Sequence, residues 1–162
     1  MVLVAPPRVW VEREAYVMGT TLRIAVAAPS RADGVRAIEA AFEAVRRVDD
    51  LLSTWRDDSE IAHLNQAPVG HAVRLSPALY TLLRDAARWT RVTGGAFDPA
   101  IGSLVDAWDL RGKGRIPSTE TLARARAAGG MRHFAFTDSA RTVTRDDSAS
   151  WLDTGGIGKG VA

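Results

Sequence analysis

The segment with the clearest capacity for chemistry is a glycine-rich stretch near the end of the 162-residue sequence, from Asp153 to Gly160. Its glycines let the backbone approach a ligand closely and take positive φ angles. A helix that begins there would direct its first amide groups at an anion, and Lys159 would add a full positive charge. The segment therefore predicts a phosphate or pyrophosphate site. The alternative is a plain glycine-rich turn with an exposed lysine.

Two familiar phosphate-binding motifs do not fit this stretch. A P-loop requires Gly at position 153 and Ser or Thr at position 160, where the chain has Asp153 and Gly160. A dinucleotide motif of the form GxGxxG that starts at Gly156 requires Gly at position 161, where Val161 stands. Any phosphate site here must therefore follow another pattern.

Three further segments could bind a planar ligand. In the run from Thr93 to Pro99, Phe97 could line an apolar slot and Asp98 could accept hydrogen bonds, or Phe97 could belong to the core and Asp98 could cap a helix. Trp55 follows a short polar run and could stack on a flavin or adenine ring, or pack beneath helix ends. Met18 could contact a ligand or pack in the interior.

Composition narrows the function classes. The sequence has no cysteine, which excludes disulfides, thiolate metal sites and thiol nucleophiles. Its three histidines lack the spacing of a metal site, so we interpret them as surface or structural residues. Basic residues are scattered and the net charge is only +2, which argues against nucleic-acid binding. No apolar run approaches the roughly 20 residues of a membrane span.

The elements that must position these residues indicate an α+β protein. Alternation predicts strands over 9–17 and 20–27 with a hairpin or bend at 18–20, and apolar spacing predicts a long amphipathic helix over 29–52. Capping residues and periodicity predict further helices over 59–64, 76–92, 100–110 and 118–128. Strands follow over 134–136, 141–145 and 150–153. Successive strands and then helices favour α+β over a repeated βαβ series.

Taken together, these segments resemble the ApbE-type FAD:protein FMN transferases from about residue 13 onward. The motifs that carry the resemblance stand in a fixed order: Met18 to Thr21, Val48-Asp49, Leu52-Ser53 with Trp55, Asp58 to Ile61 with Asn65, Thr93 to Gly102, Leu104-Val105 with Trp108, and Asp153 to Gly160. Each motif is weak alone, and their order and spacing are specific together.

The resemblance implies an ApbE-like α+β fold, an antiparallel or mixed sheet packed with amphipathic helices, in which 1–162 form the N-terminal portion of a single FAD-binding domain. It implies Mg²⁺-dependent transfer of FMN from FAD to a Thr or Ser of a target flavoprotein, such as a membrane redox subunit, with release of AMP. By position, the FAD contacts would be Met18, Trp55, Ala96, Phe97, Asp98, Asp153 and Lys159. The backbone carbonyl of Gly156 would join the Mg²⁺ shell.

The same resemblance places the catalytic groups outside this sequence. The remaining metal ligands and the histidine that activates the acceptor hydroxyl would follow Ala162, so we expect the chain alone to be inactive. An FAD pyrophosphatase that yields FMN and AMP, and a non-catalytic FAD-binding protein, remain as alternatives. The sequence shows no signal peptide or lipobox cysteine, which is compatible with a cytoplasmic or a processed periplasmic protein.

Overall fold

The computed structural model describes residues 8–162, so the expectation that 1–7 contain no export signal lies outside the described part of the chain. The molecule consists of two compact units. One contains residues up to Asp50 together with Gly158–Ala162, and the other spans Leu51–Ile157. Within the described residues, no helix is both long and apolar enough to cross a membrane.

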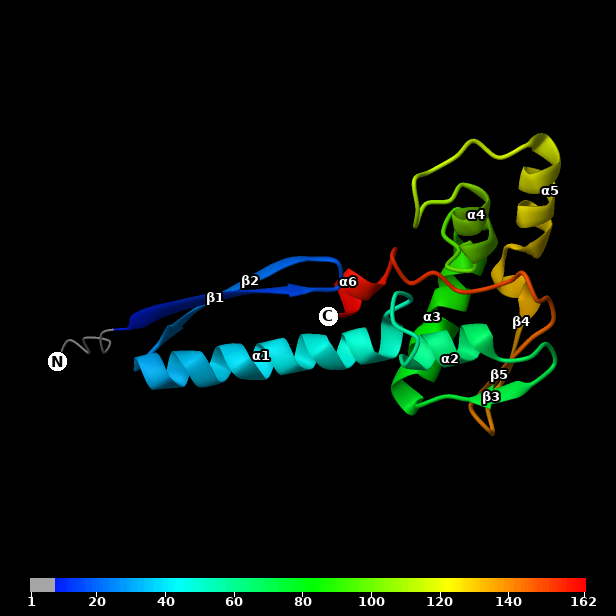
Figure 1. Cartoon of the computed structure of the whole chain (residues 1–162). Helices are drawn as coiled ribbons and strands as arrows, with labels where there is room; N and C mark the ends of the chain where they lie inside the picture. Colours follow the sequence, from blue (N-terminus) through cyan, green and yellow to red (C-terminus); the bar gives the residue numbers. More distant parts are fainter. Residues whose placement is uncertain (1–7) are drawn as a thin grey trace. The chain divides into compact units, whose positions relative to one another are not determined.

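The first unit is a β-hairpin packed on a long helix (Figure 1). Strands β1 (Val9–Val17) and β2 (Thr20–Ala28) pair antiparallel from Val9↔Ala28 to Val17↔Thr20. Their two-residue turn has positive φ at both positions, 52° at Met18 and 72° at Gly19, as hairpin turns of this length favour. The predicted strands and turn are confirmed.

Helix α1 (Arg31–Leu52) buries its predicted apolar face against the hairpin. Ile38 and Phe42 form a core cluster with Val11 of β1. The helix and strand approach closely at Gly34, where a Cβ atom would lie 2.6 Å from Cγ2 of Val11. The short helix α6 (Gly158–Val161) belongs to the same unit.

The second unit combines a three-stranded antiparallel sheet with four helices. The strand order is β3-β5-β4, formed by β3 (Ala72–Arg74), β5 (Thr142–Arg145) and β4 (Phe134–Thr137). The α-helices are α2 (Glu60–Gln66), α3 (Pro77–Val92), α4 (Gly102–Ala107) and α5 (Thr119–Ala128), and a 3-10 turn spans Met131–His133. Its largest fully buried apolar side chains are those of Leu52, Ile61, Leu64, Leu79, Leu83, Val143 and Leu152.

The structure corrects the predicted elements at four places. The helix predicted over 100–110 covers only Gly102–Ala107, and β3 and the 3-10 turn were not predicted. The strand predicted over 150–153 is wrong, because this segment pairs with no strand. Its backbone instead bonds to the loop before α4, to the first residue of α4 and to the side chain of Asn65, which accepts from Leu152 N at 2.8 Å and donates to Leu152 O at 3.0 Å.

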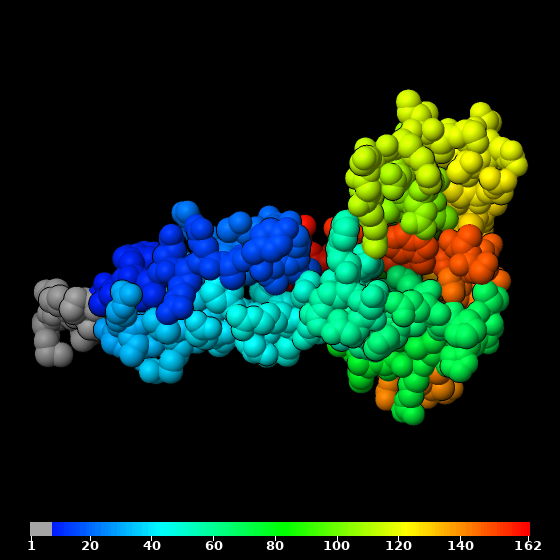
Figure 2. All heavy atoms as spheres, viewed as in Figure 1, coloured from blue at the N-terminus to red at the C-terminus, as the bar shows by residue number. Residues whose placement is uncertain are grey.

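That segment runs through the middle of the second unit. Leu152 is fully buried, Trp151 O accepts from Gly102 N at 3.1 Å, and Asp153 N donates to Pro99 O at 2.8 Å. In Figure 2 its orange atoms lie between the yellow-green atoms of α4 and α5 and the green atoms of α2 and α3. The α+β prediction, with antiparallel sheets and amphipathic helices, is confirmed.

Candidate functional site

The glycine-rich segment forms the turn that its sequence predicts. The Asp153 carboxylate accepts a hydrogen bond from Gly155 N at 2.8 Å, and Ile157 N donates to Thr154 O at 3.0 Å. Thr154 is buried and its hydroxyl donates to Leu52 O, which anchors the turn. Gly155 and Gly156 are exposed, so their peptide groups are open to a ligand. The turn leads into α6, on which Lys159 is exposed.

Phe97 lies beside this turn in the second unit. Helix α3 ends at Val92 and the chain reverses through Gly94 and Gly95, which have φ angles of 61° and 84°. Thr93 then accepts from Phe97 N through its hydroxyl at 3.1 Å. A Cβ atom on Gly156 would lie 3.9 Å from Cε2 of Phe97, so the structure brings together two segments that are 59 positions apart (156 minus 97).

Asp98 has structural partners in this conformation. Its Oδ1 atom accepts from Ala100 N at 2.8 Å and its Oδ2 atom from Met131 N at 3.1 Å. The carboxylate also borders an open groove of about 440 Å³ between α3 and the 3-10 turn, which Arg84, Arg91 and Phe134 help to line. The alternative that Asp98 is the N-cap of the next helix is wrong, because that position belongs to Ile101. Ala96, which precedes Phe97, is exposed.

Trp55 is not a core residue. Its side chain is 73% exposed, which excludes the alternative that it packs beneath helix ends. One face of its indole is occupied, because the guanidinium of Arg111 lies 4.9 Å from the ring centroid. The same guanidinium lies 4.5 Å from the ring of Trp151. The aromatic surface predicted at Trp55 is therefore largely exposed, and the guanidinium of Arg111 packs on its ring.

Met18 and Lys159 belong to the first unit. Met18 occupies the hairpin turn, and its Cε atom is 3.1 Å from the position that a Cβ atom on Gly158 would take. The methyl group thus packs on the first residue of α6, one position before Lys159. The predicted residues therefore form two sets, one in each unit, and the backbone from Gly156 to Lys159 joins them.

The sequence did not single out Arg111 or Trp151. Arg111 is one of many scattered basic residues, and nothing in its local pattern distinguishes it from Arg115 in the same loop. Its importance depends on tertiary contacts, since it meets Trp55 and Trp151 only in the folded unit. The position of Trp151 two residues before Asp153 is the only sequence signal that could have drawn attention to it.

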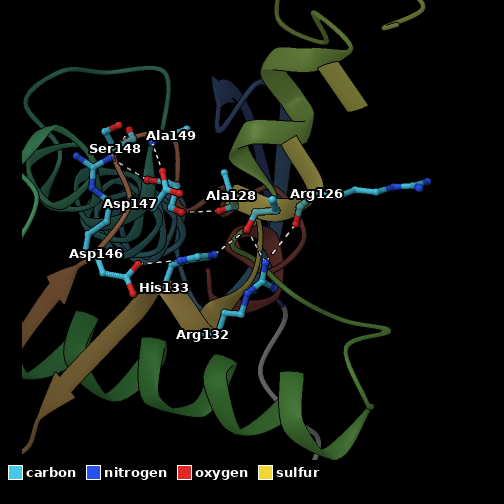
Figure 3. Close-up of polar contacts among 11 residues, drawn as sticks. Arg126, Ala128, Arg132, His133, Asp146, Asp147, Ser148 and Ala149 are labelled. Atoms are coloured by element: carbon cyan, nitrogen blue, oxygen red, sulfur yellow. Dashed lines mark hydrogen bonds and ion pairs between the residues drawn. The ribbon is translucent and has the colours of Figure 1, made fainter. Parts of the chain in front are cut away.

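The histidines serve as structural or surface residues. His63 and His71 are exposed. His133 lies at the C-terminal end of α5, with Nδ1 2.7 Å from Asp146 Oδ1 and Nε2 2.8 Å from Ala127 O. Figure 3 shows it beside Arg132, which donates to the carbonyls of Arg126 and Ala127. Cationic and donor side chains at a helix C-terminus satisfy its last carbonyls.

A Mg²⁺ site would fit these residues only in part. The exposed carbonyl of Gly156 is the kind of oxygen ligand that Mg²⁺ accepts, and this ion completes its shell with waters and phosphate oxygens. Across residues 8–162 there is no group of three or more His, Cys, Asp or Glu side chains that could hold a metal ion. The described residues therefore offer an oxygen ligand at Gly156 but no cluster of three such side chains.

The fold is shared with solved structures of ApbE proteins. The chain superposes on the flavin transferase ApbE from Vibrio cholerae with a TM-score of 0.83 at 29% identity, covering 95% of this chain and 50% of that one. The ApbE protein from Thermotoga maritima gives a TM-score of 0.84 at 28% identity, with 93% and 49% covered. The chain therefore has the fold of these ApbE proteins.

Sequence comparison gives the family. The model described as "ApbE family" matches residues 18–162, and the chain belongs to the ApbE family. An FAD:protein FMN transferase from Vibrio cholerae is 31% identical over 147 residues, which are 88% of this chain and 43% of the relative. One from Treponema pallidum is 30% identical over 155 residues, with 91% and 43% covered. The chain spans less than half the length of these curated relatives.

Proposed function

We propose that the protein containing this chain transfers FMN from FAD to a Thr or Ser of a target flavoprotein and releases AMP, in a reaction that requires Mg²⁺. Membrane redox subunits are one class of target that fits. The observation that carries the proposal is the approach of Phe97 to Gly156, which joins an aromatic segment to an exposed glycine-rich turn. The family match supports it, since residues 18–162 include every proposed contact.

Each proposed contact has a distinct part in binding FAD. The exposed indole of Trp55 and the ring of Phe97 offer flat apolar surfaces for the flavin or adenine rings. Met18 adds a polarizable side chain, and Ala96, Asp98 and Asp153 offer backbone and carboxylate groups. Lys159 would face the phosphates, where negative charge develops as the pyrophosphate breaks.

The reaction balances as a phosphoryl-type displacement. The acceptor hydroxyl attacks the phosphorus of the FMN half, the bridging P–O bond breaks, and AMP leaves with the bond's electron pair. Bound Mg²⁺ would neutralise charge on the phosphate oxygens, with Gly156 O as one of its ligands. A base must remove the hydroxyl proton, and we expect it to come from sequence beyond Ala162. The chain of 162 residues is therefore expected to be inactive alone.

The test compares the complete translated protein with its Lys159→Ala variant, using isotope-labelled FAD, Mg²⁺ and an extract of the source cells. Mass spectrometry then detects Thr or Ser peptides that carry one FMN, and chromatography detects AMP. Loss of Lys159 should lower the rate by roughly 100-fold or more, as loss of one group that stabilises developing charge commonly does. Lys113, the only other lysine, is exposed in a loop and provides the matched control, Lys113→Ala.

The products separate this proposal from its alternatives. Label on protein supports the transferase, and label only in free FMN with AMP would identify a pyrophosphatase. Tight FAD binding without AMP would identify a storage protein. Transfer of FMN by the chain 1–162 alone would refute the expectation that the chain is inactive by itself.

A further inference from the structure

Arg111 occupies an unusual position for a loop arginine. Its guanidinium lies between two indole rings, 4.9 Å from the centroid of Trp55 and 4.5 Å from that of Trp151. Its Nη1 atom donates to Thr54 O at 2.6 Å, and its Nη2 atom lies 3.5 Å from Asp153 Oδ2. One side chain thus contacts two segments, 54–55 and 151–153, that are distant from it and from each other in the sequence.

Trp151 is the fixed side of this stack. Its Nε1 atom donates to Asp106 Oδ2 at 2.7 Å, and its carbonyl accepts from Gly102 N at 3.1 Å. The ring packs so closely on Gly102 that a Cβ atom there would lie 1.9 Å from Cδ2 of the indole. Contacts at the ring edge, at the ring face and at the main chain thus fix the position of Trp151, which can therefore serve as an anchor.

Trp55 is the free side of the stack. With 73% of its surface exposed, little apart from Arg111 fixes the plane of its ring. The hydrogen bond from Arg111 to Thr54 O also fixes the peptide group that precedes Trp55. The planar guanidinium therefore transmits the position of the anchored Trp151 to an exposed aromatic surface.

Arg111 also has unused donor capacity beside Asp153. Its Nε and Nη2 atoms are buried and make no hydrogen bond, although Nη2 is within ion-pair distance of the carboxylate. Asp153 is 19% exposed and its other oxygen already accepts from Gly155 N. The arginine thus connects the aromatic surface of Trp55 to the carboxylate that begins the glycine-rich turn.

We propose that Arg111 is a positioning residue, which fixes the ring plane of Trp55 and the orientation of Asp153 before the flavin nucleotide binds. The inference rests on the proposed function, because Trp55 and Asp153 are proposed FAD contacts. Ordering a side chain in advance removes an entropic cost from binding. The expected contribution of one such side chain is a roughly 3- to 10-fold tighter Kd for FAD.

The test measures FAD binding to the complete translated protein and three variants. Arg111→Met keeps much of the volume and removes the charge and the plane, and Arg111→Lys keeps the charge near Asp153 without the planar stack. Arg115→Met is the matched control, since Arg115 in the same loop bonds only to the carbonyls of Asp106 and Ala107 in the described contacts. FAD affinity is read from flavin fluorescence, and thermal stability is measured in parallel.

A second readout does not involve FAD. Incorporation of 5-fluorotryptophan gives one fluorine resonance for each tryptophan, five of which lie in this chain, and Trp55→Phe and Trp151→Phe variants assign the two that matter. In Arg111→Met the resonances of Trp55 and Trp151 should shift, and that of Trp55 should narrow as its ring gains motion. In Arg115→Met both should stay in place.

The inference predicts that Arg111→Met weakens FAD binding by roughly 3- to 10-fold, that Arg111→Lys is intermediate, and that Arg115→Met binds normally. If Arg111→Met binds FAD like the unsubstituted protein, the positioning role is wrong while the proposed function stands. If Arg111→Met and Arg115→Met lower the melting temperature and weaken FAD binding equally, Arg111 is merely structural. Failure of the unsubstituted protein to bind FAD would instead overturn the proposed function.

Discussion

At the scale of residues, polar side chains in this protein serve mainly to fix irregular backbone. Asn65 takes the place of a strand partner for Leu152, and Arg145, which is 7% exposed, donates to the carbonyls of Ala67, Ser148 and Ser150. Desolvation lowers the pKa of Arg145 from its ordinary value. Such contacts replace the regular ladders that a helix or sheet would supply.

His133 offers a test of this role. Both of its ring nitrogens face oxygen acceptors, at 2.7 and 2.8 Å, and its side chain is 17% exposed. Substitution by alanine would remove this donor from Ala127 O, which would keep its hydrogen bond from Arg132. We expect His133→Ala to lower the free energy of unfolding by about 0.5–1.5 kcal/mol.

Urea unfolding measures this change, and the exposed His71 provides the control. His71→Ala should alter stability by no more than about 0.5 kcal/mol. Equal small effects of the two substitutions would show that the contacts of His133 contribute nothing to the fold.

Single residues of the proposed site differ in how far the sequence alone could predict them. Glycine spacing and the charge of Lys159 are local signals, so the sequence could single out 153–160 as a candidate phosphate site, and the roles of Asp153, Gly156 and Lys159 stay predictions. The exposure of Trp55 was left open, since an aromatic after a polar run suits a core or a surface equally. Arg111 could not be identified, because its two indole partners lie 56 and 40 positions away (111 minus 55, 151 minus 111).

At the scale of elements, prediction succeeded where caps and periodicity agree. Ser76 precedes Pro77 and accepts from Leu79 N, and α3 covers 77–92 as expected. It failed where tertiary contacts determine the backbone: 150–153 pairs with no strand, and its partners include Asn65, Pro99 and Gly102. β3 has only three residues and little alternation of its own, so only its pairing with β5 defines it.

Gly102 is a position where an element admits no side chain. Its backbone lies against the Trp151 ring, and a Cβ atom would come within 1.9 Å of that ring. Gly102→Ala must displace Trp151 or the first turn of α4, and such overpacking costs about 1–3 kcal/mol. The measurement is thermal unfolding followed by near-UV circular dichroism, which reports the tryptophan environments.

Gly160 in α6 is the control for this substitution, because a Cβ atom there would meet nothing within 4 Å. Gly160→Ala should be neutral or stabilise the protein by up to roughly 1 kcal/mol. A Gly102→Ala protein as stable as Gly160→Ala would mean that Trp151 is free to move, contrary to its role as an anchor.

At the scale of the whole molecule, the two units have separate cores. In the first unit, Val11, Ile38 and Phe42 pack together. In the second unit, Leu83 belongs to a larger set of fully buried residues. Because burial of apolar surface is the main source of stability, each core should support its own unit.

Amide hydrogen exchange can resolve the two cores. Phe42→Ala removes a large buried ring, which costs about 3–5 kcal/mol, and should reduce protection in β1, β2 and α1 more than in α3. Leu83→Ala should have the reverse effect. A uniform loss of protection in both variants would show that the described chain unfolds as one cooperative unit.

The pair of hydrogen bonds between Asn65 and Leu152 has a consequence for the synthesis of the protein on the ribosome. Its two partners are 87 residues apart, so α2 emerges long before the peptide group that completes it. At roughly 5–20 residues per second, the wait is about 4–17 s. Throughout that interval the amide of Asn65 is satisfied by water, and the interior beneath Leu152 stays open. A nascent chain stalled before this point should therefore expose apolar surface to chaperones.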